Sequence, residues 1–150
     1  MRYLLVFTLL AIPGFAQEFC SDSFQTSISG SSLTIDHFEA VYNCCSIVTV
    51  EDNLQGSTLT LTEGEIPPYC WCECCFTIST TVEDLPPGEL IVNVIYFDLG
   101  VWEVWDTTVI IPDVGQSGSG FLADLWKSDC GETVVDDPIQ SWGSVKALYR

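Results

Sequence analysis

Eight cysteines are the residues of this 150-residue chain whose type and spacing could do chemistry. Six of them fall in one central stretch, as Cys44-Cys45 and Cys70-Trp71-Cys72-Glu73-Cys74-Cys75, and the other two are Cys20 and Cys130. Cysteines at this density can be joined in disulfides, hold a soft metal ion as thiolates, or exchange electrons. Which chemistry applies depends on the compartment and on the elements that position the sulfur atoms.

Disulfides between strands are the interpretation that we favour. Residues two apart on a strand lie roughly 6.5 Å apart along its axis, at the upper edge of what a disulfide spans, and adjacent cysteines could bridge only with a strained peptide. We therefore expect Cys44 and Cys45 to meet two of the four cysteines at 70–75, and the remaining two to pair with each other. Cys20 and Cys130 would form the last bridge. Each bridge would add about 2 to 4 kcal/mol, but the spacing does not fix a complete map.

A thiolate metal site is the alternative. Zinc or copper(I) could be held by Cys44, Cys45, Cys70, Cys72, Cys74, Cys75 and the only histidine, His37. Zinc sites usually separate paired ligands by about two to four residues, whereas the clustered cysteines here are adjacent or one residue apart. Oxidising surroundings favour disulfides, and no helical Cys-x-x-Cys motif supports redox exchange. Calcium held by loop carboxylates such as Asp98 and Asp113 is a weaker alternative, because no calcium-binding loop is present. We expect no metal.

The first residues predict export. Met1-Arg2-Tyr3 is a basic start, Leu4 to Ile12 is an apolar run, and Gly14-Phe15-Ala16 places small residues at a cleavage site, which are the three parts of a signal peptide. We expect residues 1–16 to be removed, leaving a chain that begins at Gln17. The apolar run is much shorter than the roughly 20 residues that span a bilayer. The sequence therefore predicts a secreted, periplasmic or cell-surface protein without a membrane span.

The charge of the chain excludes several partners. Without Arg2, three basic residues face 21 acidic ones, a net charge of −18. Such a charge repels phosphate backbones and anionic lipid headgroups, so we expect no nucleic-acid partner. The acidity keeps an exported protein soluble or, alternatively, attracts a cation or a basic partner.

Catalytic motifs are missing from the sequence. No Gly-x-Ser-x-Gly motif occurs, and no acidic partner for His37 can be identified. Carboxylate pairs such as Asp136-Asp137 fall in predicted turns, where they bind local backbone or face solvent. We expect no enzymatic activity and no cofactor.

Alternating apolar and polar residues predict an all-β fold. We expect strands at Ser31–Phe38, Cys45–Val50, Ser57–Thr62, Cys70–Val82, Leu90–Phe97 and Val101–Ile111, with turns at 51–56 and 84–89. This pattern is typical of an antiparallel β-sandwich. The predicted core comprises Leu33, Ile35, Leu59, Leu61, Phe76, Ile78, Leu90, Val92 and Val94.

The chain beyond Ile111 has a different composition. We divide it into a flexible Gly/Ser linker at 112–120 and a C-terminal tail at 121–150, after a disulfide-stapled sandwich at 17–111. Short helices are expected at Phe121–Trp126 and Ser141–Tyr149.

Several segments of the chain resemble a known group of proteins. Tyr42-Asn43-Cys44-Cys45, Cys70-Trp71-Cys72-Glu73-Cys74-Cys75-Phe76 and Leu85-Pro86-Pro87-Gly88-Glu89-Leu90 are similar to uncharacterised bacterial exported domains with paired cysteines and an immunoglobulin-like sandwich. The ending Ser141-Trp142-Gly143-Ser144-Val145-Lys146-Ala147-Leu148-Tyr149-Arg150 resembles a sorting or anchoring tail of exported bacterial proteins. The resemblance covers about half of the chain and implies an immunoglobulin-like topology, but it implies no catalytic residue.

Together these observations predict an exported, non-catalytic binding or structural module. Its partner would be a protein or a component of the cell envelope. A thiolate metal-binding protein is one alternative. An immunoglobulin-like proteinase inhibitor is another, for which Gly64-Glu65-Ile66-Pro67-Pro68-Tyr69 is the candidate loop.

Overall fold

The structure, a computed structural model, describes residues 20–98, 100–115 and 117–130. They contain eight strands: β1 (Ser23–Ser29), β2 (Ser32–Asn43), β3 (Ile47–Gln55), β4 (Thr58–Ile66), β5 (Glu73–Glu83), β6 (Gly88–Asp98), β7 (Val101–Ile111) and β8 (Phe121–Lys127). The predicted signal peptide at 1–16, the helix at 141–149 and the C-terminal signature lie outside the described residues.

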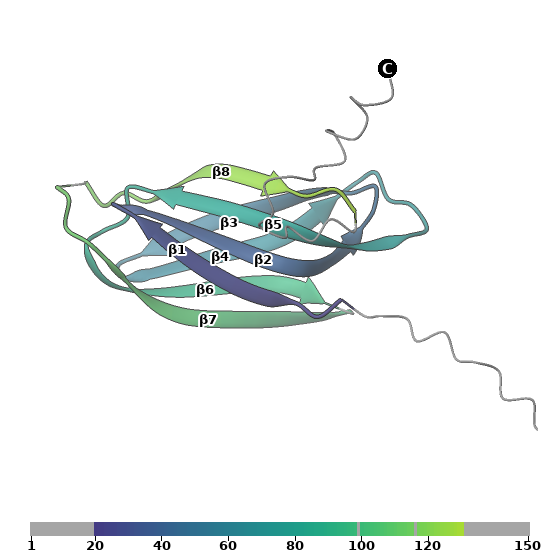
Figure 1. Cartoon of the computed structure of the whole chain (residues 1–150), viewed down its shortest axis with the longest axis horizontal. Coiled ribbons are helices and arrows are strands. Elements are labelled where there is room, and N and C mark those ends of the chain that lie inside the picture. The colour runs from purple at the N-terminus through teal and green to yellow at the C-terminus, as the bar shows by residue number, and fades with distance from the viewer. Residues whose placement is uncertain (1–19, 99, 116, 131–150) are drawn as a thin grey trace, which may run out of the picture.

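The strands form two four-stranded sheets, in the orders β1-β2-β5-β8 and β3-β4-β6-β7 (Figure 1). The all-β prediction is confirmed. The first sheet is wholly antiparallel, but β4 and β6 are parallel neighbours in the second. This differs from the expected all-antiparallel arrangement because the chain leaves the second sheet after β4, forms β5 in the first sheet, and returns as β6 in the direction of β4.

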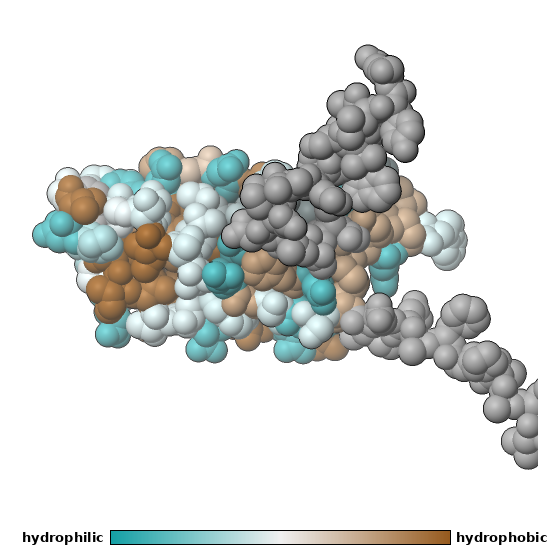
Figure 2. All heavy atoms as spheres, viewed as in Figure 1, coloured by the Kyte–Doolittle hydropathy of each residue, from teal (hydrophilic) through white to brown (hydrophobic). Residues whose placement is uncertain are grey.

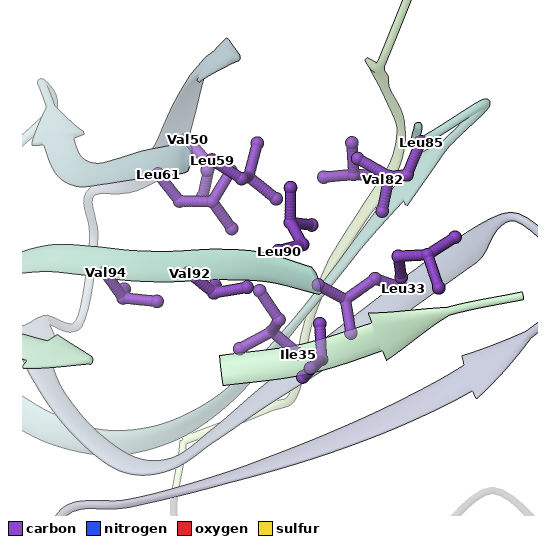
Figure 3. Close-up of a cluster of buried hydrophobic side chains, with 12 residues drawn as sticks. Leu33, Ile35, Val50, Leu59, Leu61, Val82, Leu85, Leu90, Val92 and Val94 are labelled. Carbon is purple, nitrogen blue, oxygen red and sulfur yellow. The ribbon is translucent and has the colours of Figure 1, made fainter. Parts of the chain in front are cut away.

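The core lies between the two sheets. The larger hydrophobic cluster joins Leu33 and Ile35 of β2 to side chains of β4 and β6 from the opposite sheet (Figure 3). All nine predicted core residues are buried. Leu85 is also completely buried, although the sequence places it in a turn. Full burial of each such aliphatic side chain stabilises the fold by about 1.5 to 3 kcal/mol.

The hairpin predicted between the second and third expected strands is confirmed, but its turn lies later. β3 and β4 pair antiparallel up to Gln55 and Thr58, so Gly56-Ser57 is the turn. Gly56 has a φ of 61°, which glycine adopts at little cost. The polar residues predicted as a turn continue β3 instead, because Leu54 packs against the core and extends the inward alternation.

The helix predicted at Phe121–Trp126 is wrong. These residues belong to β8, which pairs with β5 at the edge of the first sheet, so 121–127 is part of the sandwich and not of a separate tail. Leu122 and Leu125, three residues apart, are both half-buried. Strand residues three apart normally point to opposite faces. Here a register shift between Thr81 and Val82 of β5 accommodates both side chains, because a bulge places two residues opposite one.

The predicted flexible linker at 112–120 is anchored to the sandwich through Asp84. The Asp84 carboxylate accepts hydrogen bonds from the backbone N–H groups of Ser117, Gly118 and Ser119 and from both serine hydroxyls. These bonds hold the pKa of Asp84 well below its ordinary value of 3.8, because each of them favours the ionised carboxylate.

This anchor makes a prediction about acid stability. Because its pKa is lower in the folded chain than in the unfolded chain, Asp84 stabilises the fold above about pH 4. That contribution is lost as the pH falls below the unfolded-state value towards the folded-state one. Thermal unfolding of Asp84→Asn should therefore occur at a lower temperature than that of the unmodified chain at pH 7, and the difference should become smaller as the pH falls from about 4 to about 2. Asparagine tolerates the φ of 55° at this position. A gap between the two melting temperatures that stays constant with pH would contradict the anchor.

Candidate functional site at the disulfide end of the sandwich

All eight cysteines lie at one end of the sandwich. Four of the strands, β2, β4, β6 and β8, run towards this end, and the other four start from it. It carries the segments 43–46 and 66–72 and the tip between β6 and β7. We call it the disulfide end. The opposite end holds the β1–β2, β3–β4, β5–β6 and β7–β8 connections.

The sulfur atoms form four disulfides: Cys20–Cys75, Cys44–Cys72, Cys45–Cys70 and Cys74–Cys130. Their Cα–Cα separations of 5.5 to 5.8 Å lie within the range of disulfides. The predicted pairing of Cys44 and Cys45 with two of the later cysteines is confirmed. Four disulfides are typical of proteins that fold in an oxidising compartment.

The predicted Cys20–Cys130 bridge and the pairing of the two leftover cysteines are wrong. Cys74 and Cys75 are neighbours on β5, and neighbouring strand residues point to opposite faces of a sheet. Each therefore meets a different partner. Cys75 holds the segment before β1 through Cys20, and Cys74 holds the segment after β8 through Cys130.

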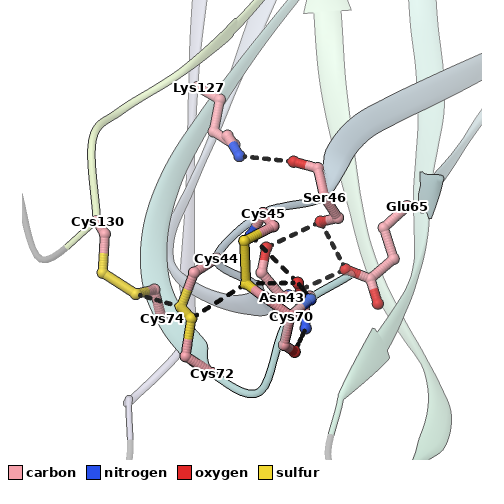
Figure 4. The surroundings of a disulfide bond; sticks show 10 residues. All are labelled: Asn43, Cys44, Cys45, Ser46, Glu65, Cys70, Cys72, Cys74, Lys127 and Cys130. Carbon is pink, nitrogen blue, oxygen red and sulfur yellow. Dashed lines mark hydrogen bonds between the residues drawn. A yellow bond between two sulfur atoms is a disulfide. The ribbon is translucent and has the colours of Figure 1, made fainter. Parts of the chain in front are cut away.

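Three of the disulfides contact one another (Figure 4). Cys44 Sγ lies 3.0 Å from Cys74 Sγ, and Cys70 Sγ lies 3.4 Å from Cys72 Sγ. The sulfur atoms of Cys44, Cys74 and Cys130 lie within 4.8 Å of one another. Thiolates, not disulfide sulfurs, bind metals, so this group could hold an ion only after reduction. His37 does not belong to this group.

Asn43 joins the β2–β3 loop and the β4–β5 loop of the disulfide end. Its Oδ1 accepts hydrogen bonds from the backbone N–H groups of Cys45 and Cys70, and its Nδ2 donates to the Cys70 carbonyl. Glu65 Oε2 accepts from the Asn43 N–H at 3.0 Å and from the Ser46 hydroxyl at 2.8 Å (Figure 4). The loops are therefore fixed by side-chain hydrogen bonds in addition to the disulfides.

A cavity of about 420 Å³ opens at the disulfide end. It is lined by Val41, Tyr42, Asn43, Gly64, Glu65, Glu73, Phe97, Gly100 and Trp102. A second hollow, which shares Asn43 and Glu73 with the first, extends along Cys70, Trp71 and Cys72. Trp71 is fully exposed, and Trp102 is 58% exposed. An exposed tryptophan therefore lines each of the two hollows.

The face of the molecule seen in Figure 2 is mixed, with hydrophilic and apolar side chains interspersed. Its largest brown area lies towards the end to which the β1 arrow of Figure 1 points, away from the disulfide end.

His37 is part of a buried network that the sequence analysis missed. Its Nδ1 lies 2.8 Å from Glu63 Oε2, which also accepts the Tyr42 hydroxyl hydrogen at 2.9 Å. Burial and the Glu63 carboxylate raise the pKa of Tyr42. His37 and Tyr42 lie on β2 and Glu63 lies on β4. Because these strands belong to different sheets, the network joins one sheet to the other. Strict alternation after Leu33-Ile35 and Leu59-Leu61 points both His37 and Glu63 inward, and this was the signal available in the sequence.

The His37 ring is only 1% exposed. Phe24 stacks on it at 4.0 Å between ring centroids, and Tyr96 contacts it edge-on at 4.8 Å. The ring is thus enclosed by aromatic groups and cannot reach a substrate.

The two carboxylates considered for calcium do not meet. Asp98 ends β6 at the disulfide end, whereas Asp113 follows β7 at the opposite end. Asp113 Oδ1 instead accepts the N–H of Gly115 at 3.2 Å, as aspartates often do in turns. These two residues cannot share an ion.

Comparisons with known proteins identify no relative. No family model matches the chain, and neither the curated proteins nor the solved structures contain a significant match. Within the part of the chain that the structure describes, no helix has the length and hydrophobicity needed to cross a membrane.

Proposed function

We propose that this protein is an exported, non-catalytic binding module whose binding surface is the disulfide end. One observation carries the proposal: disulfides converge on a single end of the sandwich and hold the loop that lines one hollow with Cys70, Trp71 and Cys72, next to a cavity of about 420 Å³ that is lined by Trp102. Ligand sites usually have volumes of about 300 to 1,000 Å³. Tryptophan and tyrosine are also the side chains most enriched at binding hot spots.

The fixed loops support binding rather than a purely structural role. Cys44–Cys72, Cys45–Cys70 and the Asn43 hydrogen bonds join the segments 43–46 and 66–72. A surface that is already ordered loses less conformational entropy when it binds, which raises affinity. A protein that needed only stability could place its disulfides anywhere in the fold.

The sequence supports the remaining parts of the proposal. The signal-like residues 1–16 and four disulfides favour a secreted, periplasmic or cell-surface location. The burial of His37, the only histidine, favours a non-catalytic role. From the cysteine motifs at 42–45 and 70–76, we also propose that the chain is one of the bacterial exported domains with immunoglobulin-like topology. Its last residues, 141–150, would then serve in sorting.

A peptide selection tests the proposed surface. A phage-displayed library of random peptides would be selected on the oxidised full chain, and the dissociation constants of the enriched peptides measured. We expect Trp71→Ala and Trp102→Ala each to weaken binding by about tenfold or more. The matched control is Ile110→Ala, because Ile110 is 63% exposed on β7 but lies at the opposite end. Equal affinities for all three variants would contradict the proposal.

Thiolate metal binding is a second candidate, supported by the proximity of the Cys44, Cys74 and Cys130 sulfur atoms. It would operate only in a reduced form of the protein. Zinc titration of the fully reduced, refolded chain tests it: stoichiometric zinc that is lost in Cys130→Ser would support this function, and no uptake would exclude it.

The proteinase-inhibitor alternative uses the same surface. Gly64, Glu65 and Ile66 are part of β4, so the exposed loop is 67–72 rather than the predicted 64–69. Tyr69 is 56% exposed in this loop, and Cys45–Cys70 holds it. An inhibitor would bind a protease through this loop and resist cleavage there, which an incubation with serine proteases measures.

A further inference from the structure

We infer that the cavity at the disulfide end binds the cationic side chain of an arginine or lysine in a partner polypeptide. The inference rests on the proposed function and specifies its ligand. Its basis is the combination of carboxylates and aromatic rings in one concave site.

The two carboxylates of the cavity come from different sheets. Glu65 lies near the end of β4, and Glu73 begins β5. Glu65 Oε2 is occupied by Asn43 and Ser46, and this fixes the side chain in place. Glu65 Oε1 has no hydrogen-bond partner among the described residues. Glu73 is exposed, so a ligand can approach its carboxylate. Two acidic groups on different walls favour a positively charged group between them.

The aromatic wall has the geometry for a cation. Phe97 and Trp102 are cross-strand partners on β6 and β7, and their ring centroids lie 5.3 Å apart in an edge-to-face arrangement. Both rings line the cavity. A cation within about 6 Å of an aromatic ring is attracted by its π electrons, most strongly by tryptophan. The aromatic rings would also contact the aliphatic stem of an arginine or lysine.

No positive charge from the described part of the chain competes for this site. Lys127 is the only lysine or arginine among the described residues. Its Nζ donates to the Ser46 carbonyl at 3.1 Å and lies 4.2 Å from the centre of the Phe76 ring, and it does not line the cavity. The acidic groups at the cavity are therefore available to an external cation, and the net charge of −17 would attract a basic partner from a distance.

Matched peptides test this inference. The probes are acetyl-Ala-Arg-Ala-amide and the same peptide with citrulline, which keeps the shape of arginine without its charge. Binding to the oxidised full chain is followed by tryptophan fluorescence and by calorimetry. We expect saturable binding of the arginine peptide, at least about tenfold weaker binding of the citrulline peptide, and weakening by added salt, because a charge-assisted hydrogen bond contributes more than a neutral one.

Variants connect the binding to the cavity. Glu73→Gln should weaken the arginine peptide by about tenfold, and Trp102→Leu should weaken it as well. Glu51→Gln is the matched control, because Glu51 is an exposed glutamate on β3 that does not line the cavity. Equal binding of the two peptides, or an unchanged affinity in Glu73→Gln, would overturn the inference. If selected peptides without basic residues bind the disulfide end and depend on Trp71, the proposed function stands and the cationic ligand is wrong.

Discussion

Replacing Cys74 and Cys130 together by serine should lower the free energy of unfolding by about 4 kcal/mol. The disulfide joins residues 56 positions apart in the sequence. Removing a crosslink of this length returns a large amount of conformational entropy to the unfolded chain, and the removal of native disulfides costs about 2 to 5 kcal/mol. Chemical denaturation at neutral pH, without reductant, measures the loss.

The location of the effect distinguishes this disulfide from the others. β8 pairs only with β5 at the sheet edge, and Ser128 continues the contact by exchanging hydrogen bonds with Thr77. Hydrogen exchange should therefore accelerate first in 121–128 of the double variant. The matched control is the replacement of Cys45 and Cys70, whose disulfide joins residues only 25 positions apart. This replacement should lower the free energy of unfolding by less and leave β8 protected from hydrogen exchange. Uniformly faster exchange in both variants would contradict this account of β8.

Replacing Glu63 by alanine should lower the free energy of unfolding by about 3 kcal/mol. Glu63 is 3% exposed, and its Oε2 is within hydrogen-bond distance of both His37 Nδ1 and the Tyr42 hydroxyl. The substitution leaves two buried polar groups without their partner, and each such group costs about 1 to 3 kcal/mol. Chemical denaturation at pH 7 measures the loss.

Glu63→Gln is the matched control for this network. Glutamine keeps the shape and an acceptor oxygen for the Tyr42 hydroxyl, so it should cost less than half as much as alanine. Thr62→Ala tests the neighbouring strand position, which is only partly buried on the other face of β4, and it should have a small effect. If Glu63→Ala and Thr62→Ala destabilise the fold equally, the network does not fasten the two sheets.

Local alternation carried most of the fold prediction. The pattern from Leu59 to Thr62 gave the inward face of β4 correctly, because a strand buried on one side alternates with a period of two. β1 was missed because Ser23–Ser29 contains only Phe24 and Ile28 as apolar residues. Its place in the sheet depends on backbone pairing with β2, which leaves little trace in the composition.

Long-range pairing could not be predicted in the same way. The spacing of the cysteines excludes some pairings. The partners of Cys74 and Cys75, however, depend on which chain segments lie beside β5. The same applies to the cavity. Its residues come from β2, β4, β5, β6, β7 and the β6–β7 turn, and they meet only because those strand ends share one end of the sandwich. Asn43 lies between two predicted strands and carried no predicted role, yet its amide holds two loops together.

The measurement that tests the central claim most directly is disulfide mapping of the exported protein by mass spectrometry, with metal analysis of the same sample. Proteolysis without reduction, after alkylation of free thiols, should give the pairs Cys20–Cys75, Cys44–Cys72, Cys45–Cys70 and Cys74–Cys130 and no alkylated cysteine. That result would establish the covalent frame on which the binding surface depends. Alkylated Cys44, Cys74 and Cys130 together with stoichiometric zinc or copper would contradict it and make the sulfur cluster a metal site.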